Sequence, residues 1–117
     1  MTPGNDEEQP RTIRVLADYE CHPLWPGENV GDLSPHDPDL GLTPDLAARL
    51  DAWAAEFDAI LCRDDPASSA FPTPEAELAF ARTGEKLAVR LARELGPGWR
   101  VRYFDPRTGA DRSVPAP

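Results

Sequence analysis

The stretch from residue 43 to residue 62, TPDLAARLDAWAAEFDAILC, constrains the fold more than any other part of the chain. Thr43 is a favourable N-cap, and Pro44 suits the first helical position because its missing N–H costs nothing there. Trp53 is the largest apolar side chain in the stretch. Apolar residues recur at steps of three and four, the period of a helix with one buried face: Leu46, Leu50, Trp53, Phe57, Ile60 and Leu61. We therefore predict a helix over 43–62 that anchors the core, with about 2 kcal/mol for each large side chain that is fully buried.

A second helix is predicted to begin at Thr73 and Pro74 with the same capping chemistry and to end before the sequence Gly96-Pro97-Gly98. Its apolar stripe consists of Phe80, Leu87, Leu91 and Leu95. Gly84 lies on this stripe, although a glycine inside a helix costs nearly 1 kcal/mol relative to alanine. A close helix–helix contact at Gly84 is the interpretation that explains this choice.

Alternating apolar residues predict strands over 13–19 and 99–105, and a short edge strand over 111–114. The order is then strand, long loop, helix, helix, strand and possible strand. It indicates an α/β fold in two layers, with two antiparallel helices packed on one face of a small two- to three-stranded sheet. The first and last main strands are expected to be neighbours, and the sequence leaves their relative direction open.

The segment 20–42 contains four prolines and three glycines, which are expected to exclude a regular element of any length. Its apolar residues indicate that it folds over one edge of the core, where Leu24 and Trp25 would hold it. Trp25 has a second interpretation as an anchor for a partner, because tryptophan is enriched at interface hot spots. The sequence does not decide whether this segment is a lid or a binding loop.

The length of 117 residues indicates one domain, which we place at 11–114. Residues 1–10 are polar and acidic and are predicted to be a disordered tail, and residues 115–117 are predicted to fray. The acidic N-terminus is the opposite of a signal peptide, and no apolar run is long enough to span a bilayer. We expect a cytoplasmic protein.

The net charge of −9 is concentrated in one segment. Between residues 18 and 65 there are twelve acids and only two bases, Arg49 and Arg63, which gives −10; the rest of the chain has nine acids and ten bases. This distribution argues against binding to nucleic acid or to an anionic membrane, since both require a positive surface. It is compatible with a basic protein partner. Alternatively, the acidity serves only solubility.

No motif for catalysis or metal binding is present. Cys21 and His22 lack the spacing of a zinc site, and a disulfide between Cys21 and Cys62 is not expected in a reducing compartment. The pair Asp37 and Asp39 lacks the third ligand and the terminal Glu of a calcium loop. We expect no metal, no cofactor and no catalytic residue. A small hydrolase remains the third hypothesis, because catalytic groups need not be close in sequence.

Several motifs support a resemblance that covers most of residues 13–104. They are Tyr19-x-Cys21-x-Pro23-Leu24-Trp25, Leu50-x-x-Trp53-x-x-x-Phe57-Asp58, Asp64-Asp65-Pro66-x-x-Ser69-x-Phe71, Gly84 and Glu94-Leu95-Gly96. In these residues the chain resembles small acidic uncharacterised proteins of high-GC bacteria, some of which are similar to immunity proteins that neutralise secreted toxins. The shared residues are mainly structural aromatics and turn residues, so the resemblance implies a shared fold and transfers no functional residue.

The charge distribution and the resemblance together favour a binding or inhibitory protein. Its partner would be a basic protein, for example a toxin nuclease, recognised through the acidic surface between residues 20 and 65. The candidate partner-binding residues are Trp25, Asp37, Asp39, Asp58, Asp64 and Asp65. The alternative is a structural or assembly component whose acidity confers only solubility.

Overall fold

A computed structural model describes residues 11–27, 31–60 and 71–115. Its elements are β1 (Arg11–Val15), β2 (Leu24–Pro26), α2 (Pro44–Asp58), α3 (Pro74–Leu95), β3 (Trp99–Asp105) and β4 (Ala110–Ser113). The predictions for residues 1–10, Cys62, Asp64, Asp65 and 116–117 concern positions outside this description. Neither of the two described helices is both long and apolar enough to cross a membrane.

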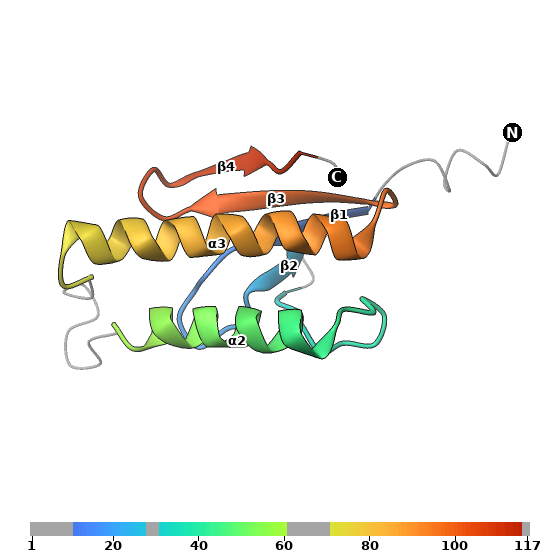
Figure 1. Cartoon of the computed structure of the whole chain (residues 1–117), viewed down its shortest axis with the longest axis horizontal. Coiled ribbons are helices and arrows are strands. Elements are labelled where there is room, and N and C mark those ends of the chain that lie inside the picture. The colour runs from blue at the N-terminus through green and yellow to red at the C-terminus, as the bar shows by residue number, and fades with distance from the viewer. Residues whose placement is uncertain (1–10, 28–30, 61–70, 116–117) are drawn as a thin grey trace, which may run out of the picture.

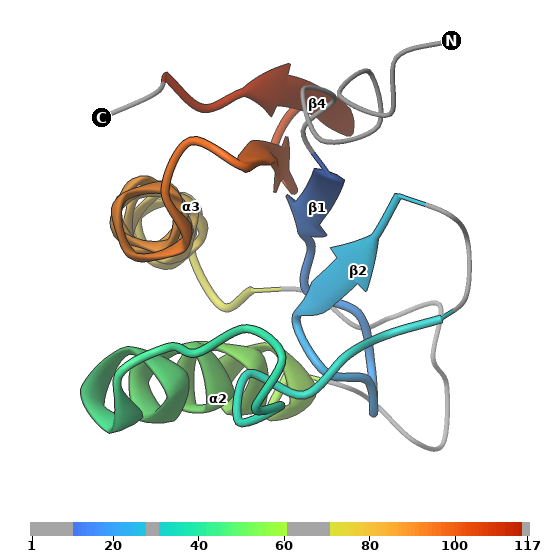
Figure 2. The same ribbon diagram turned by 90° about the vertical axis from the view of Figure 1, so that its right-hand side faces the viewer.

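The four strands form one mixed sheet in the order β2-β1-β3-β4 (Figure 2). β1 and β3 are neighbours, as predicted, and they run parallel, which the sequence had left open. The outer strands β2 and β4 both pair antiparallel. In the central register Ile13 lies opposite Val101 and Val15 opposite Tyr103, and all four side chains are buried on the face that α3 covers. The α/β class is confirmed, with one strand more than the two to three predicted.

The additional strand is β2, in the segment where no regular element was expected. Leu24, Trp25 and Pro26 pair antiparallel with β1, and the Gly27 N–H extends the ladder by bonding to the Thr12 carbonyl at 2.9 Å. A strand with proline at its end is possible because β2 lies at the edge of the sheet, where only one side needs hydrogen bonds. Leu24 is fully buried, so this residue does hold the segment to the core.

The two helices run in opposite directions (Figure 1). The N-terminus of α2 meets the C-terminal end of α3: the Thr43 N–H donates to Glu94 at 2.8 Å, and Arg90 lies 2.6 Å from Asp45. Both threonine caps form as predicted. α2 ends at Asp58 rather than at residue 62, because the Ile60 N–H bonds to the Phe57 carbonyl in a tighter three-residue step that interrupts the α-helical pattern.

α2, α3 and β3 meet at Gly84. A Cβ at this position would overlap the Trp53 ring and lie 2.6 Å from the Tyr103 hydroxyl. The Trp53 indole N–H donates to the Phe80 carbonyl at 3.0 Å, and the Tyr103 hydroxyl donates to the Ala81 carbonyl at 2.7 Å. The close contact predicted for Gly84 is confirmed, and it involves the sheet as well as the other helix. We call Trp53, Gly84 and Tyr103 the core seam.

A row of aromatic rings extends this core toward the chain segment before β2. Phe71 packs against Phe57 and Phe80, with ring centroids 6.3 and 5.0 Å apart, and so lies against the core. On the other side of Phe57, the Tyr19 ring stacks at a centroid distance of 4.5 Å. This stack fixes the turn that follows β1 against the C-terminal half of α2.

Candidate protein-binding site

A cavity of about 300 Å³ lies between this turn and α2. Among the described residues, four carboxylates line it, and no Lys or Arg does. The lining residues are Glu20, Cys21, His22, Pro23, Asp32, Asp51, Ala54, Ala55 and Asp58. We call it the acidic cavity.

α2 supplies one wall of the acidic cavity from a single helical face. Asp51, Ala54, Ala55 and Asp58 are spaced by three, four and seven residues, so they lie beside one another on two successive turns. The two alanines are short, and the carboxylates stand on either side of them. The hollow between two acidic side chains therefore follows directly from the helical spacing.

The turn supplies the opposite wall and is held by its own hydrogen bonds to carboxylates. The Glu20 N–H donates to Asp58 Oδ1 at 2.7 Å, and the His22 N–H donates to Asp32 Oδ2 at 2.5 Å. Glu20 has a φ of 61°, in the left-handed region that non-glycine residues rarely adopt. Such a conformation costs on the order of 1 kcal/mol and persists only where surrounding contacts hold it. Here those contacts are the Asp58 hydrogen bond and the Tyr19 stack.

The pKa of the Cys21 thiol is affected by the negative charges around the cavity. Its pKa is raised above the ordinary value, first by burial and then by the negative charges of Asp18, Asp32, Asp58 and Glu20. Both effects disfavour the thiolate, which is the nucleophilic form of cysteine. The environment of Cys21 is therefore the reverse of the electropositive surroundings that activate a catalytic thiol.

The carboxylate oxygens of the cavity suit a cationic side chain. Within residues 11–27, 31–60 and 71–115, no group of three or more His, Cys, Asp or Glu side chains is arranged to hold a metal ion. One of the carboxylates, Asp51, contacts His36 Nε2 at 2.6 Å. Carboxylates offer only acceptor atoms when ionised, so a Lys ammonium or Arg guanidinium has the matching chemistry.

The structure brings one predicted partner-binding residue, Asp58, into the acidic cavity. Asp37 and Asp39 lie in the loop before α2, outside the cavity lining, where Asp37 Oδ1 accepts the Asp39 N–H at 2.9 Å. Trp25 is half-buried on β2, and its indole N–H donates to the Leu16 carbonyl at 3.0 Å. Asp64 and Asp65 fall outside the described residues.

Three lining carboxylates, Glu20, Asp32 and Asp51, were counted in the charge of the segment but were not singled out. The seven-residue separation of Asp51 and Asp58 on a predicted helix was the available signal, since it places both on one face. Glu20 and Asp32 gave no comparable signal, because their place in the cavity depends on the path of an irregular segment.

The chain thus has a two-layer α/β fold with a carboxylate-lined cavity between α2 and the turn that follows β1. The model of one protein family matches residues 11–106, and that family is described as Serratia CdiI immunity protein-like. The chain belongs to this family. No curated protein matches the sequence.

Proposed function

We propose that the chain is an immunity protein that neutralises a toxin by binding it, and that the acidic cavity receives a cationic side chain of this toxin. The observation that carries the proposal is a cavity whose lining, in the part of the chain that the structure describes, has four carboxylates and no Lys or Arg, in a member of an immunity protein-like family. Binding a basic toxin domain would block the toxin's contact with its own target.

Two properties of the cavity support a cationic partner. Asp51 and Asp58, on the α2 wall, are partly buried, and a guanidinium or ammonium in direct contact would stabilise them through charge-assisted hydrogen bonds. The segment from residue 18 to residue 65 carries −10, and a field of this sign steers a basic partner toward the cavity. We include Trp25, Asp37, Asp39, Asp64 and Asp65 in the proposed contact surface, and we expect the protein to act in the cytoplasm.

The first test identifies the partner and its effect on cells. The tagged chain is used to capture partners from a lysate of the cells that encode it, and each captured protein is then expressed alone and together with the chain. We expect a basic protein that arrests growth when expressed alone and does not when the chain is present. Failure of the chain to restore growth would contradict the immunity role.

The second test asks whether the acidic cavity is the contact. The double variant Asp51→Asn/Asp58→Asn removes two charges but keeps the side-chain shapes and the oxygen that accepts the Glu20 N–H. We expect it to weaken the affinity for the captured partner by about tenfold or more, as for charges that are desolvated on binding. The matched control, Glu75→Gln/Glu77→Gln, removes the same charge from the first turn of α3. Equal effects of the two variants would show that only net charge matters.

A further inference from the structure

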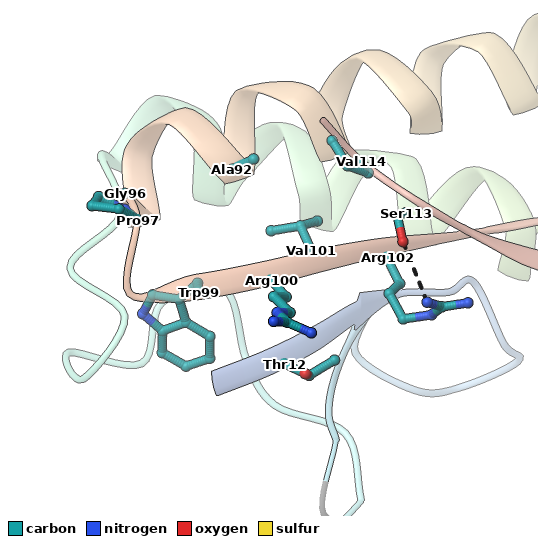
Figure 3. Close-up of a pocket in the computed structure, with 10 residues that line it drawn as sticks. All are labelled: Thr12, Ala92, Gly96, Pro97, Trp99, Arg100, Val101, Arg102, Ser113 and Val114. Atoms are coloured by element: carbon teal, nitrogen blue, oxygen red, sulfur yellow. Dashed lines mark hydrogen bonds between the residues drawn. The ribbon is translucent and has the colours of Figure 1, made fainter. Parts of the chain in front are cut away.

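A second cavity, of about 490 Å³, lies along β3 between the C-terminal end of α3 and the end of β4 (Figure 3). It shares no residue with the acidic cavity. The lining residues are Thr12, Ala92, Gly96, Pro97, Trp99, Arg100, Val101, Arg102, Ser113 and Val114. We call it the β3 groove.

The charge of the β3 groove is opposite to that of the acidic cavity. The chain has 21 acidic and 12 basic residues, yet the described residues that line the groove include two arginines and no carboxylate. The other polar side chains in the lining, the hydroxyls of Thr12 and Ser113 and the indole of Trp99, can also donate hydrogen bonds. A ligand that satisfies this lining must therefore offer acceptor atoms, and an anion does so best.

Neither arginine of the groove has a close carboxylate partner among the described residues. The Arg100 side chain is exposed and forms no hydrogen bond or ion pair with any residue in the described part of the chain. Arg102 makes only long contacts, 3.4 Å to the Ser113 hydroxyl and 3.9 Å to Asp111. Asp111 is also the carboxylate nearest to Arg14, at 3.7 Å, so one acid serves both of these side chains.

Two other arginines near the end of β3 are paired with carboxylates: Arg107 in the turn before β4 and Arg112 on β4. Arg107 and Arg112 both bond to the buried carboxylate of Asp105, at 3.1 and 3.0 Å. Arg112 additionally reaches Glu85 at 2.7 Å. Arg107 and Arg112 thus have their charge matched by carboxylates of the same chain, whereas Arg100 has no such partner among the described residues.

The remaining walls of the groove are apolar. Val101 points toward Ala92 of α3, whereas Arg100 and Arg102 lie on the side of β3 nearest Thr12 (Figure 3). At one end the Trp99 ring is half-buried and carries the Arg11 guanidinium 4.2 Å from its centroid. The groove therefore combines an apolar surface with donors gathered along one side.

We propose that the β3 groove binds a small organic anion: an apolar or aromatic group that carries a carboxylate or phosphate. The apolar part lies against Val101, Val114 and Trp99, and the anionic group accepts hydrogen bonds from Arg100 and Arg102. The volume falls within the range of about 300–1,000 Å³ that is typical of small-molecule sites. This proposed site is separate from the acidic cavity, because the two share no described lining residue.

The test follows backbone amide and tryptophan indole resonances of the ¹⁵N-labelled protein by NMR. The probes are phenyl phosphate, inorganic phosphate and, as a cationic control, benzylamine. We expect phenyl phosphate to shift the Trp99 indole and the Val101 and Val114 amides saturably, with a dissociation constant of about 1 mM or tighter. Inorganic phosphate should bind more weakly because it lacks the apolar part, and benzylamine should not shift these resonances.

Two variants decide whether the groove is responsible. Arg100→Ala should weaken phenyl phosphate binding by about tenfold. Arg82→Ala removes an equally exposed arginine from α3, one without a side-chain partner among the described residues, and should leave binding unchanged. Shifts spread over all basic residues, or equal affinity in both variants, would overturn the proposal. Tighter binding of a glutamate-rich peptide than of phenyl phosphate would also overturn it and would identify the groove as a protein-docking site.

Discussion

The core seam and the acidic cavity both involve α2, but the seam is formed by buried aromatic rings and the cavity by carboxylates. At the seam, Trp53 and Tyr103 bury their rings against Gly84, and each satisfies its polar atom with a carbonyl of α3. In the cavity, carboxylates converge beside a residue, Glu20, in a left-handed conformation. Residues whose local charge or backbone conformation destabilises the fold tend to lie at functional sites. The comparison teaches that this helix uses one face to hold the fold and another to present charge.

The largest expected effect lies at the seam. Trp53→Ala removes a side chain that is only 1 % exposed and is expected to lower the free energy of unfolding by about 3–5 kcal/mol. Chemical denaturation of the wild type and the variant measures this. A change below about 1 kcal/mol, the typical value for a point mutant, would mean that the seam does not carry the stability of the domain.

Gly84→Ala tests the closeness of the same packing. The new methyl group would overlap the Trp53 ring, so the gain in helix propensity is outweighed by an overpacking cost of about 1–3 kcal/mol. Thermal unfolding followed by circular dichroism checks the sign. A matched Ala substitution at Gly98, which has open space around its Cβ position, should be far less harmful. If Gly84→Ala raised the melting temperature, the contact would be looser than described.

A third prediction concerns Asp105, a buried carboxylate that bonds to two arginines. Burial tends to raise the pKa of Asp105, but hydrogen bonds from Arg107 and Arg112 outweigh it and lower this pKa to about 2 from the ordinary 3.8. A lowered folded-state pKa contributes stability above the unfolded value, and that stability is lost as the pH falls toward 2. Its contribution is about 2 kcal/mol.

Unfolding free energies measured between pH 5 and pH 2 test this for the wild type and for Asp105→Asn. We expect the wild type to lose more stability over this range than the variant, which has no carboxylate to protonate at that position. Parallel pH profiles would contradict the assigned role of Asp105.

The smallest expected effect on stability is in the acidic cavity. Asp51→Asn/Asp58→Asn should change the free energy of unfolding by less than about 0.5 kcal/mol, because both side chains are partly exposed and asparagine keeps their shape. Denaturation under the same conditions as for Trp53→Ala gives the direct contrast. A large loss of stability would show that the cavity carboxylates are structural.

The elements with strong local signals could be predicted from the sequence. The threonine caps at Thr43 and Thr73 and the apolar periods that follow them depend on neighbouring residues only, and both helices begin where expected. Gly84 was also informative, because a glycine on an apolar stripe needs a steric reason. β2 could not be predicted, since its three residues form a strand only by pairing with β1.

The sequence predicted the negative charge of the candidate site but not the arrangement of its residues in space. Counting acids located the negative segment, and Asp58 was named among its candidates. The cavity itself depends on the hydrogen bond between the Glu20 N–H and Asp58, which joins positions 38 residues apart. It also depends on a left-handed Glu20, which no residue preference indicates. Contacts of this kind follow from the path of the chain rather than from its local composition.

The association rate of the captured partner, measured across a salt series by surface plasmon resonance, tests the central claim most directly. We expect the wild-type rate constant to fall steeply with ionic strength, because screening weakens the steering field. Asp51→Asn/Asp58→Asn should bind more slowly than Glu75→Gln/Glu77→Gln and depend less on salt. An association rate that is indifferent to salt and identical in both variants would show that the acidic cavity does not receive the partner.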